Sequence, residues 1–210
     1  VAREISLQDI AMPLRGSDNS EAEFGRIHVI WAIDGQLLTN KLTVIPKVVD
    51  RQIVSDLDRD ILKIVVVNRY DPAPPAVSFV KNFGLQQGAI ASSVAHDSHN
   101  LIAVGAHDED LCEAIRLVVQ AGGGLAAVSD GRSMVLPLPV AGLMATGTGF
   151  EVGAAYRQLD QMAKDFGCQL QSPYMTLSFM ALLVIPAIKL SDRGLFDGER
   201  FELIPVELMP

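Results

Sequence analysis

One stretch decides how the middle of this chain folds, and it reads Ala89-Ile90-Ala91-Ser92-Ser93-Val94-Ala95-His96-Asp97-Ser98-His99-Asn100. Its first seven residues are apolar or small, which is typical of a buried strand. Polar residues follow at once, so the pattern places titratable side chains at a strand end. Binding and catalytic groups are commonly mounted on loops at such scaffold ends. We therefore expect residues 96–100 to form a polar loop, either functional or only structural.

The segments around this stretch have mostly strand patterns. Asp34-Gly35 separates two β-prone segments and predicts a hairpin. Three prolines within residues 71–75 predict a loop, because proline cannot donate to a sheet ladder. A second loop is expected at residues 16–20. The expected strands are residues 26–33, 37–49, 62–67, 77–83, 89–95, 101–105, 125–128, 134–138 and 201–206.

Two segments have helical periodicity. The acidic residues 108–110 open the first helix, where carboxylates complement the positive end of the helix dipole. Gly122-Gly123-Gly124 follows this helix, so we interpret it as a C-cap and not as a phosphate-binding loop. Residues 151–166 predict the second helix. The apolar segment 173–185 fits either a buried helix or a strand.

This order of elements predicts an α+β fold. We expect layers of a mixed, largely antiparallel sheet with a few packing helices. Eight strand–helix repeats are not visible, so the chain is not a complete (β/α)₈ barrel. We expect residues 1–50 to form an N-terminal segment with a β-hairpin, which could belong to a small β-domain. Residues 51–210 would form the main α+β domain.

Composition excludes some classes of partner. The chain has 210 residues, 49% of them hydrophobic, and a formal net charge of -8. Phosphate binding needs clustered Lys and Arg, so a nucleic-acid partner is not expected. The high apolar content indicates that some apolar surface meets another domain or a second copy of the chain.

Cysteine usage and hydropathy give an expected location. Cys112 and Cys168 are far apart and lie in apolar context, which favours buried free thiols and a reducing cytoplasm. No secretory signal opens the chain. The apolar run at residues 177–188 is broken by Pro186 and is too short to span a bilayer, so no membrane partner is expected. Because the chain begins with Val1, we expect it to be processed or to be a piece of a longer protein.

The residues His96 and His99 allow three interpretations. Imidazoles three residues apart, with Asp97 between them, could hold a divalent ion, although metal sites usually need three or four protein ligands. Alternatively, Asp97 and Asn100 could cap the turn while the rings satisfy backbone groups. In the third interpretation the loop reaches into a site shared with another domain, where a carboxylate can orient a histidine ring.

Other polar motifs are expected to be structural. His107 precedes the acidic helix start and is interpreted as an N-cap. His28 alternates outward on a strand and is expected at the surface. Residues 56–60 resemble half of a calcium loop but lack its Gly and distal Glu, which favours a solvated turn. Ser92-Ser93 lacks the GxSxG pattern of a hydrolase nucleophile. Residues 136–144 are expected to be an edge strand that enters an apolar turn.

Several motifs occur in the same order as in one known family. The motifs are Asp60–Tyr70, Phe83-Gly84-Leu85, Ala95–Asn100, Asp108-Glu109-Asp110, Gly122–Gly124, Leu136–Pro139, Met175–Phe179 and Gly194–Asp197. In this respect the chain resembles the C-terminal region of bacterial adenine deaminases, from about residue 26 to the end. Two positions differ from the family pattern, namely Asn82 in place of glycine and Gln86-Gln87 in place of a Lys-Arg pair.

The resemblance implies a reaction that this chain would assist. Adenine deaminases belong to the amidohydrolase superfamily and hydrolyse adenine to hypoxanthine and ammonia in purine catabolism. Their catalytic part is a (β/α)₈ barrel with a pair of divalent metal ions, manganese or iron, and it begins with a His-x-His motif. This sequence has no His-x-His motif. The resemblance therefore implies that the barrel is a partner domain and that this chain alone is inactive and without the metal pair.

The resemblance also assigns a role to the polar loop. His96, Asp97, His99 and Asn100 would face the active site of the barrel, where closing the site excludes water and orders the purine. A homo-oligomer is also expected. One alternative is a structural or oligomerisation domain whose loop stabilises only its own turn. The other is an independent metal-binding module that uses His96 and His99.

Overall fold

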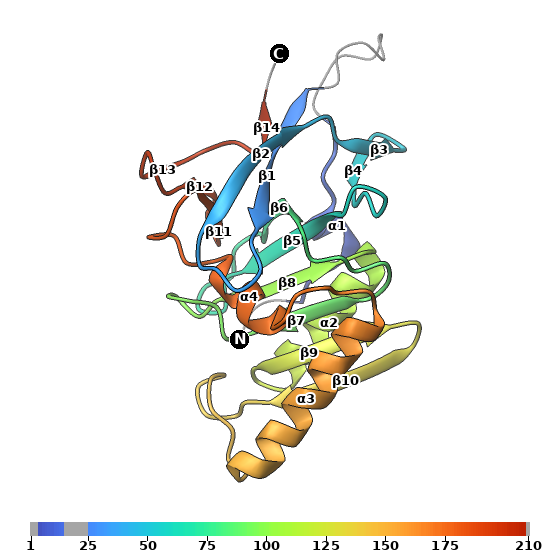
Figure 1. Ribbon diagram of the computed structural model, residues 1–210, viewed down its shortest axis with the longest axis vertical. Helices are drawn as coiled ribbons and strands as arrows, with labels where there is room; N and C mark the ends of the chain where they lie inside the picture. The colour runs from blue at the N-terminus through green and yellow to red at the C-terminus, as the bar shows by residue number, and fades with distance from the viewer. Residues whose placement is uncertain (1–3, 15–24, 209–210) are drawn as a thin grey trace.

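The computed structural model describes residues 4–14 and 25–208 (Figure 1). The loop expected at residues 16–20 lies outside this described part. The helices are α1 (Leu7–Ile10), α2 (Asp108–Gln120), α3 (Gly149–Asp165) and α4 (Pro173–Phe179). The strands are β1 (Arg26–Ala32), β2 (Thr39–Val44), β3 (Lys47–Val49), β4 (Gln52–Val54), β5 (Ile61–Val67), β6 (Ala76–Lys81), β7 (Ala89–Ser92), β8 (Leu101–Gly105), β9 (Gly124–Ser129), β10 (Arg132–Pro137), β11 (Ile188–Ser191), β12 (Gly194–Asp197), β13 (Glu202–Leu203) and β14 (Glu207–Leu208).

A nine-stranded sheet forms the middle of the molecule. Its strand order is β10-β9-β7-β8-β5-β6-β1-β14, and β2 also pairs with β1. Every pairing is antiparallel except that of β1 with β6. The described strands form no closed barrel, so the predicted α+β fold with a mixed, largely antiparallel sheet is confirmed.

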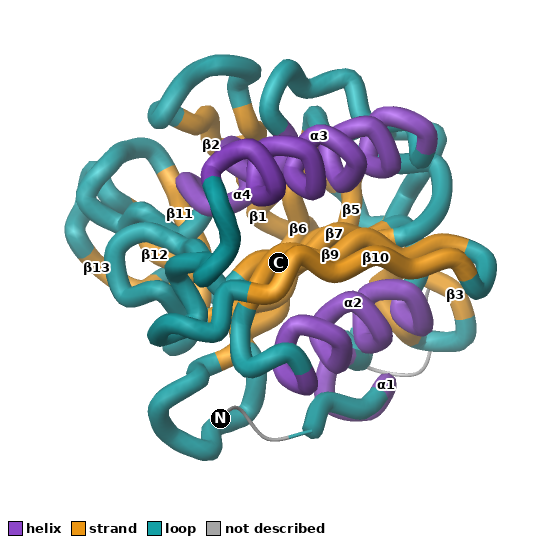
Figure 2. The backbone as a smooth tube through the Cα atoms, turned by 90° about the horizontal axis from the view of Figure 1, so that it is seen from below, coloured by secondary structure: helices purple, strands orange, loops and turns teal. Residues whose placement is uncertain are grey.

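Helices cover both faces of this sheet. Figure 2 shows α3 and α4 on one face and α1 and α2 on the other. Leu159 of α3 and Leu177 of α4 belong to the larger core cluster. Leu111, Ile115 and Val118 of α2 are buried against the opposite face, as their helical spacing predicts. The middle of the sheet is therefore buried on both sides, which explains why β5 has no alternation and all seven of its residues are buried.

The decisive stretch forms a shorter strand than expected. β7 ends at Ser92, whereas the apolar pattern predicts a strand as far as Ala95. The Ser92 hydroxyl accepts a hydrogen bond from the Val94 backbone N–H at 2.9 Å. The Ser93 N–H still donates to the Gly124 carbonyl of β9 at 2.9 Å, and beyond it this local bond accompanies the turn of the chain out of the sheet. The polar loop consequently begins three residues earlier than the hydrophobic pattern indicates.

The C-terminal part differs most from expectation. The strand expected at residues 201–206 is wrong, since only β13 and β14, two residues each, lie near it. Phe201 has a φ of +59°, which interrupts extended backbone, and Pro205 cannot donate to a ladder. The β11–β12 hairpin was not expected. The ambiguous segment 173–185 begins with helix α4, which has a proline in its first turn.

The N-terminal hairpin is confirmed by the register of β1 and β2, in which Ile27 pairs with Val44 and Ala32 with Thr39. β2 ends at Val44, and β3 pairs with β4 in a separate two-stranded sheet. Because β1 lies beside β6, the first 50 residues contribute to the same large sheet as the rest. The division into folding units at residue 50 stays a prediction.

Both cysteines are free, with Cys168 buried and Cys112 partly buried, as expected. Burial raises the pKa of each thiol to about 11, so both are protonated at neutral pH. Among the residues described, no helix has the length and apolar character that crossing a membrane requires.

Lys189 of β11 is a buried cation with a backbone partner. Its side chain is fully buried, and its Nζ donates a hydrogen bond to the Leu37 carbonyl at 2.6 Å. Burial lowers the pKa of this ammonium from 10.5 to about 8. The bond joins the loop before β2 to the small C-terminal sheet.

We expect the free energy of unfolding to depend on the titration of Lys189. Between about pH 8 and pH 10.5 the unfolded chain binds this proton more often than the folded chain, so the contribution of Lys189 to stability rises with pH. Denaturant titrations of the wild type and of Lys189→Met across this window measure it. The wild-type curve should rise relative to the variant curve, since the thiols titrate equally in both. Parallel curves would contradict the assignment.

Candidate functional site

The polar residues gather on the side of the large sheet where β5 and β7 end, at the strand ends and not along an outermost strand. β5 and β7 both pair antiparallel with β8, so they run in the same direction and end on the same side. β9 runs opposite to β7 and begins there. We call this region the β5/β7 edge and define it as residues 68–70, 93–100 and 122–124. It contains the four candidate residues and the glycines that follow α2.

Backbone bonds fix the loop after β7. The His99 N–H donates to the Ala95 carbonyl at 2.7 Å, and the His96 N–H donates to the Ser178 carbonyl of α4 at 3.2 Å. Asn100 is buried, and its side-chain oxygen accepts from the Arg69 backbone N–H at 3.3 Å. Asn100 therefore links the loops after β5 and β7 and has a structural contact of its own.

The two histidine rings lie close together. Their centroids are 5.6 Å apart in an edge-to-face arrangement, and His96 also lies 5.3 Å from the Phe179 ring. Burial, with the charges of His96 and Arg69 adding to it, lowers the pKa of His99. Its Nδ1 is buried and has no hydrogen-bond partner among the described residues. His99 is thus a neutral imidazole at pH 7 with one ring nitrogen unmatched.

The described residues supply no donor set for a metal ion. No group of three or more His, Cys, Asp or Glu side chains among them could hold one. His96 and His99 therefore have no third protein ligand within this part of the chain, and structural and catalytic metal sites need at least three. Asp97 is exposed, and its charge only partly opposes the lowering of the His99 pKa.

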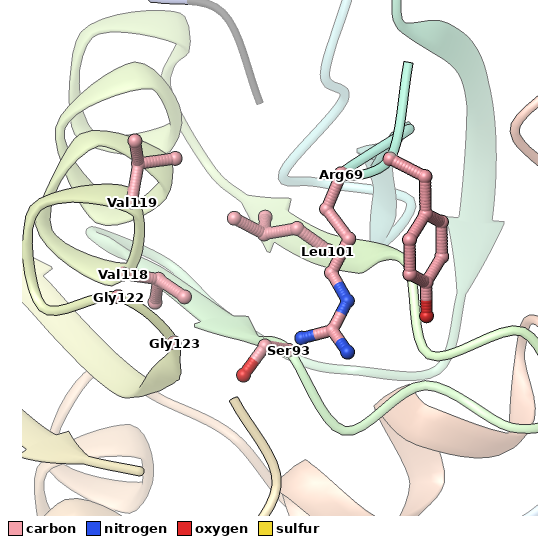
Figure 3. A pocket seen from close by; sticks show the side chains of 8 residues that line it. Arg69, Ser93, Leu101, Val118, Val119, Gly122 and Gly123 are labelled. Carbon is pink, nitrogen blue, oxygen red and sulfur yellow. The ribbon is translucent and has the colours of Figure 1, made fainter. Parts of the chain in front are cut away.

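Arg69 and Tyr70 join the site, although the sequence analysis did not single them out. The Tyr70 hydroxyl donates to the Ser98 carbonyl at 2.8 Å, and the Arg69 guanidinium lies 5.1 Å from the Tyr70 ring centroid. Arg69 Nε is buried without a partner among the described residues. Both residues directly follow a buried strand, as residues 96–100 do, so the same signal could have found them. They line a cavity of about 220 Å³ (Figure 3).

Motifs elsewhere have structural roles. His107 is the N-cap residue of α2 but makes no side-chain cap bond, and Asp108 pairs instead with the buried Lys63. His28 is partly buried and not simply at the surface; it lies 3.4 Å from the Thr43 hydroxyl, and burial lowers its pKa. The solvated turn expected at residues 56–60 is corrected in part, because Asp56 is buried and pairs with Arg59.

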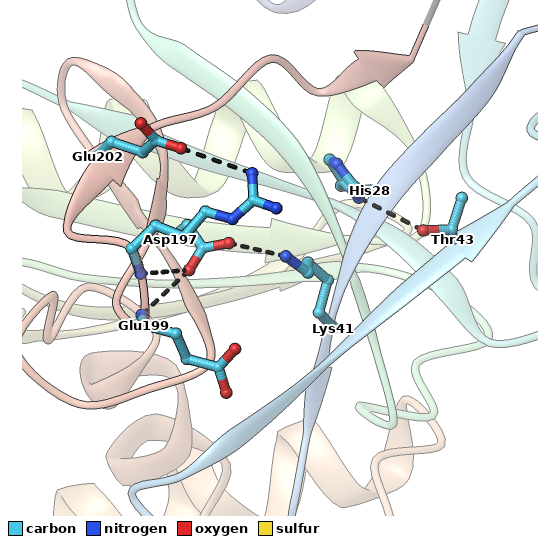
Figure 4. Close-up of polar contacts among 7 residues, drawn as sticks. His28, Lys41, Thr43, Asp197, Glu199 and Glu202 are labelled. Carbon is cyan, nitrogen blue, oxygen red and sulfur yellow. Dashed lines mark hydrogen bonds and ion pairs between the residues drawn. The ribbon is translucent and has the colours of Figure 1, made fainter.

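Figure 4 shows why the Gly194–Asp197 motif is structural. The Asp197 carboxylate accepts hydrogen bonds from the Glu199 and Arg200 backbone N–H groups, both at 3.0 Å. It also pairs with Lys41 Nζ of β2 at 2.7 Å, and this hydrogen bond lowers the pKa of Asp197. The motif therefore closes a turn and holds the small sheet against β2.

With this geometry established, comparisons with known proteins identify the family. The sequence pattern of the family described as "Adenine deaminase C-terminal domain" matches residues 36–202. The chain belongs to this family. The matched range of the adenine deaminase C-terminal domain includes β2 through β12 and the whole β5/β7 edge.

Curated relatives of this C-terminal domain are longer proteins. The adenine deaminase of Methanosarcina barkeri is 48% identical over 201 residues, which cover 96% of this chain and 36% of the relative. That of Salinibacter ruber is 51% identical over 181 residues, covering 85% of this chain and 33% of the relative. That of Parabacteroides distasonis is 41% identical over 200 residues, covering 95% and 35%. The chain thus spans about a third of the length of these relatives, and the expected resemblance to adenine deaminases is confirmed.

Proposed function

We propose that this chain is the C-terminal part of an adenine deaminase that hydrolyses adenine to hypoxanthine and ammonia in the cytoplasm. The names of the relatives support the activity, and the third of their length that the chain spans supports a larger partner domain. We place the catalytic chemistry in that partner, an amidohydrolase barrel. The two free thiols agree with a reducing compartment.

The expected pair of manganese or iron ions does not fit the described residues of this chain. They offer no group of three donor side chains, and the two adjacent histidines alone are too few. We therefore place the metal pair in the barrel as part of the proposal. No step that we assign to this chain involves it.

In this proposal the β5/β7 edge faces the purine. The observation that supports it is the pair of buried, unmatched nitrogens, His99 Nδ1 and Arg69 Nε, at one edge of the sheet. Buried polar atoms in native proteins usually have partners, so two unmatched nitrogens in one region mark it as incomplete, and we propose that the loop side chains repack around the purine or a barrel group to match them. A neutral His99 could bond either a purine nitrogen or a backbone group of the barrel. His96 packs against His99, and Phe179 packs against His96, so we propose that these rings exclude water.

The test replaces His99 by alanine in the full-length protein. We expect kcat/KM for adenine to fall about 10- to 100-fold, because loss of an orienting contact misplaces the substrate. Steady-state kinetics measure the loss, while thermal unfolding and elemental analysis check that the fold and the metal content persist.

His107→Ala is the matched control. This histidine is exposed at the start of a helix, makes no side-chain cap bond and lies outside the β5/β7 edge. Its kcat/KM should stay near that of the wild type. If His99→Ala also keeps wild-type kcat/KM with fold and metal intact, the loop has no part in catalysis.

One observation favours the alternative, a structural or oligomerisation domain. Phe150 at the start of α3 is 93% exposed, and Val140 and Met144 of the preceding segment are exposed as well. An apolar surface of this kind fits a contact with a second copy or with the barrel. In this alternative, substitutions in the 96–100 loop lower the melting temperature but leave kcat/KM unchanged.

A further inference from the structure

The cavity at the β5/β7 edge is lined by both polar and aliphatic side chains. Arg69, Tyr70 and Ser93 come from the loops after β5 and β7, whereas Leu101, Val118 and Val119 supply aliphatic surface (Figure 3). Gly122 and Gly123 complete the lining at the end of α2. Its volume of about 220 Å³ is smaller than the roughly 300–1,000 Å³ of pockets that hold drug-sized ligands. The space therefore suits a small free base better than a nucleoside or nucleotide.

The donors of this cavity come from Arg69. Its guanidinium takes part in no hydrogen bond or ion pair with the residues described, and because Nε is itself buried, the terminal nitrogens are the donors that a ligand in the cavity would meet. The Ser93 hydroxyl, by contrast, is already engaged, since it accepts from the Gly124 N–H at 2.8 Å and donates to the Gly142 carbonyl. A guanidinium has five N–H donors in a planar fork, which matches two neighbouring acceptors in one plane.

The end of α2 disfavours a simple anion as the ligand of this cavity. Gly122 and Gly123 follow the last turn of the helix, where backbone carbonyls give the helix end a partial negative charge. A negatively charged ligand is disfavoured beside such an end, whereas N–H donors are favoured. The cavity thus combines the donors of Arg69 with apolar surfaces beside the C-terminal end of a helix. This combination fits a neutral planar heterocycle that carries acceptor atoms.

We propose that this cavity binds a free 6-oxopurine, namely hypoxanthine, the product of the reaction proposed above. The inference rests on that proposed function. The O6 and N7 atoms of a 6-oxopurine form the acceptor pair that arginine reads on guanine. Adenine presents an N6 amino donor in place of O6, so one arm of the Arg69 fork would face another donor. The site therefore discriminates product from substrate, and it gives hypoxanthine a place at the β5/β7 edge after the reaction.

Isothermal titration of the 210-residue chain with hypoxanthine and with adenine tests this inference. We expect hypoxanthine to bind at least about 10-fold more tightly than adenine, because one bidentate contact discriminates by about this factor. Arg69→Met should abolish the preference, and Arg69→Lys should weaken it, since an ammonium cannot form the fork. Arg132→Met, at an exposed arginine of β10, is the matched control and should keep it.

Other outcomes overturn the inference. Equal affinity for the two bases, no hypoxanthine binding at millimolar concentration, or tighter binding of benzoate than of hypoxanthine would each contradict it, the last by showing an anion site. If Arg69→Met fails to fold, the comparison of hypoxanthine with adenine on the wild-type chain decides the test. Should the full-length protein deaminate adenine while the chain does not prefer hypoxanthine, only this inference fails. Should the full-length protein leave adenine unchanged, the proposed function fails.

Discussion

Asp108→Ala is expected to lower the free energy of unfolding by about 3–5 kcal/mol, because it leaves a buried cation without its partner. Lys63 lies in the central strand β5 and is only 1% exposed. Its Nζ donates to the Asp108 carboxylate at 2.6 Å, at the first residue of α2. The pair therefore fixes the start of this helix on the sheet. Urea unfolding of the wild type and the variant, followed by circular dichroism, measures the difference.

The opposite substitution is the control. Lys63→Met leaves Asp108, whose side chain is 29% exposed, in contact with water and at the favourable N-terminal end of α2. It should cost about 1 kcal/mol or less. The double variant should be more stable than Asp108→Ala alone, since it has no buried ammonium to leave unpaired. If Asp108→Ala is no more destabilising than Lys63→Met, the unpaired, buried ammonium of Lys63 does not cause the loss of stability.

Gly123→Ala is expected to destabilise the fold by about 2–5 kcal/mol, the sum of backbone strain and overpacking. Gly123 has a φ of +118°, and a Cβ there would collide with the Gly142 Cα. This close approach holds the turn after β10 against the end of α2. Because Gly123 also lines the cavity beside Arg69, the substitution should open the β5/β7 edge. Denaturant unfolding measures the change in stability.

The neighbouring glycine provides a matched control. Gly122 has a φ of +72°, but a Cβ there would meet nothing within 4 Å. Gly122→Ala should therefore cost only about 1–2 kcal/mol, from backbone strain alone. Equal losses for the two variants would show that the contact with Gly142 carries no packing energy.

The parts of the fold that could be predicted are those whose pattern is set by local burial. β5 is an unbroken aliphatic run, and it is the central strand. The apolar face of α2 and the Asp34-Gly35 hairpin also follow from spacing and turn chemistry. The end of β7 could not be predicted in this way, because the strand ends inside an apolar run, where the bond between the Ser92 hydroxyl and the Val94 N–H has no signal in the hydrophobic pattern.

The small C-terminal sheet was missed for a similar reason. The β11–β12 hairpin has four residues per strand and is stabilised by distant partners, Leu37 for Lys189 and Lys41 for Asp197. A strand that depends on such long-range contacts has a weak local signal. At the candidate site, the sequence identified the 96–100 loop, and the same signal marks Arg69 after β5. Only the fold shows that the two loops lie on the same side of the sheet, since β5 and β7 both run antiparallel to β8 between them.

The central claim is that the β5/β7 edge completes the catalytic chamber of a partner domain. The most direct test compares kcat/KM for adenine in two variants of the full-length protein whose metal content has been verified. The quantity measured is the value for His99→Ala divided by the value for His107→Ala. The account predicts a ratio of about 0.1 or below. A ratio near 1 would contradict it and would leave this domain a structural one.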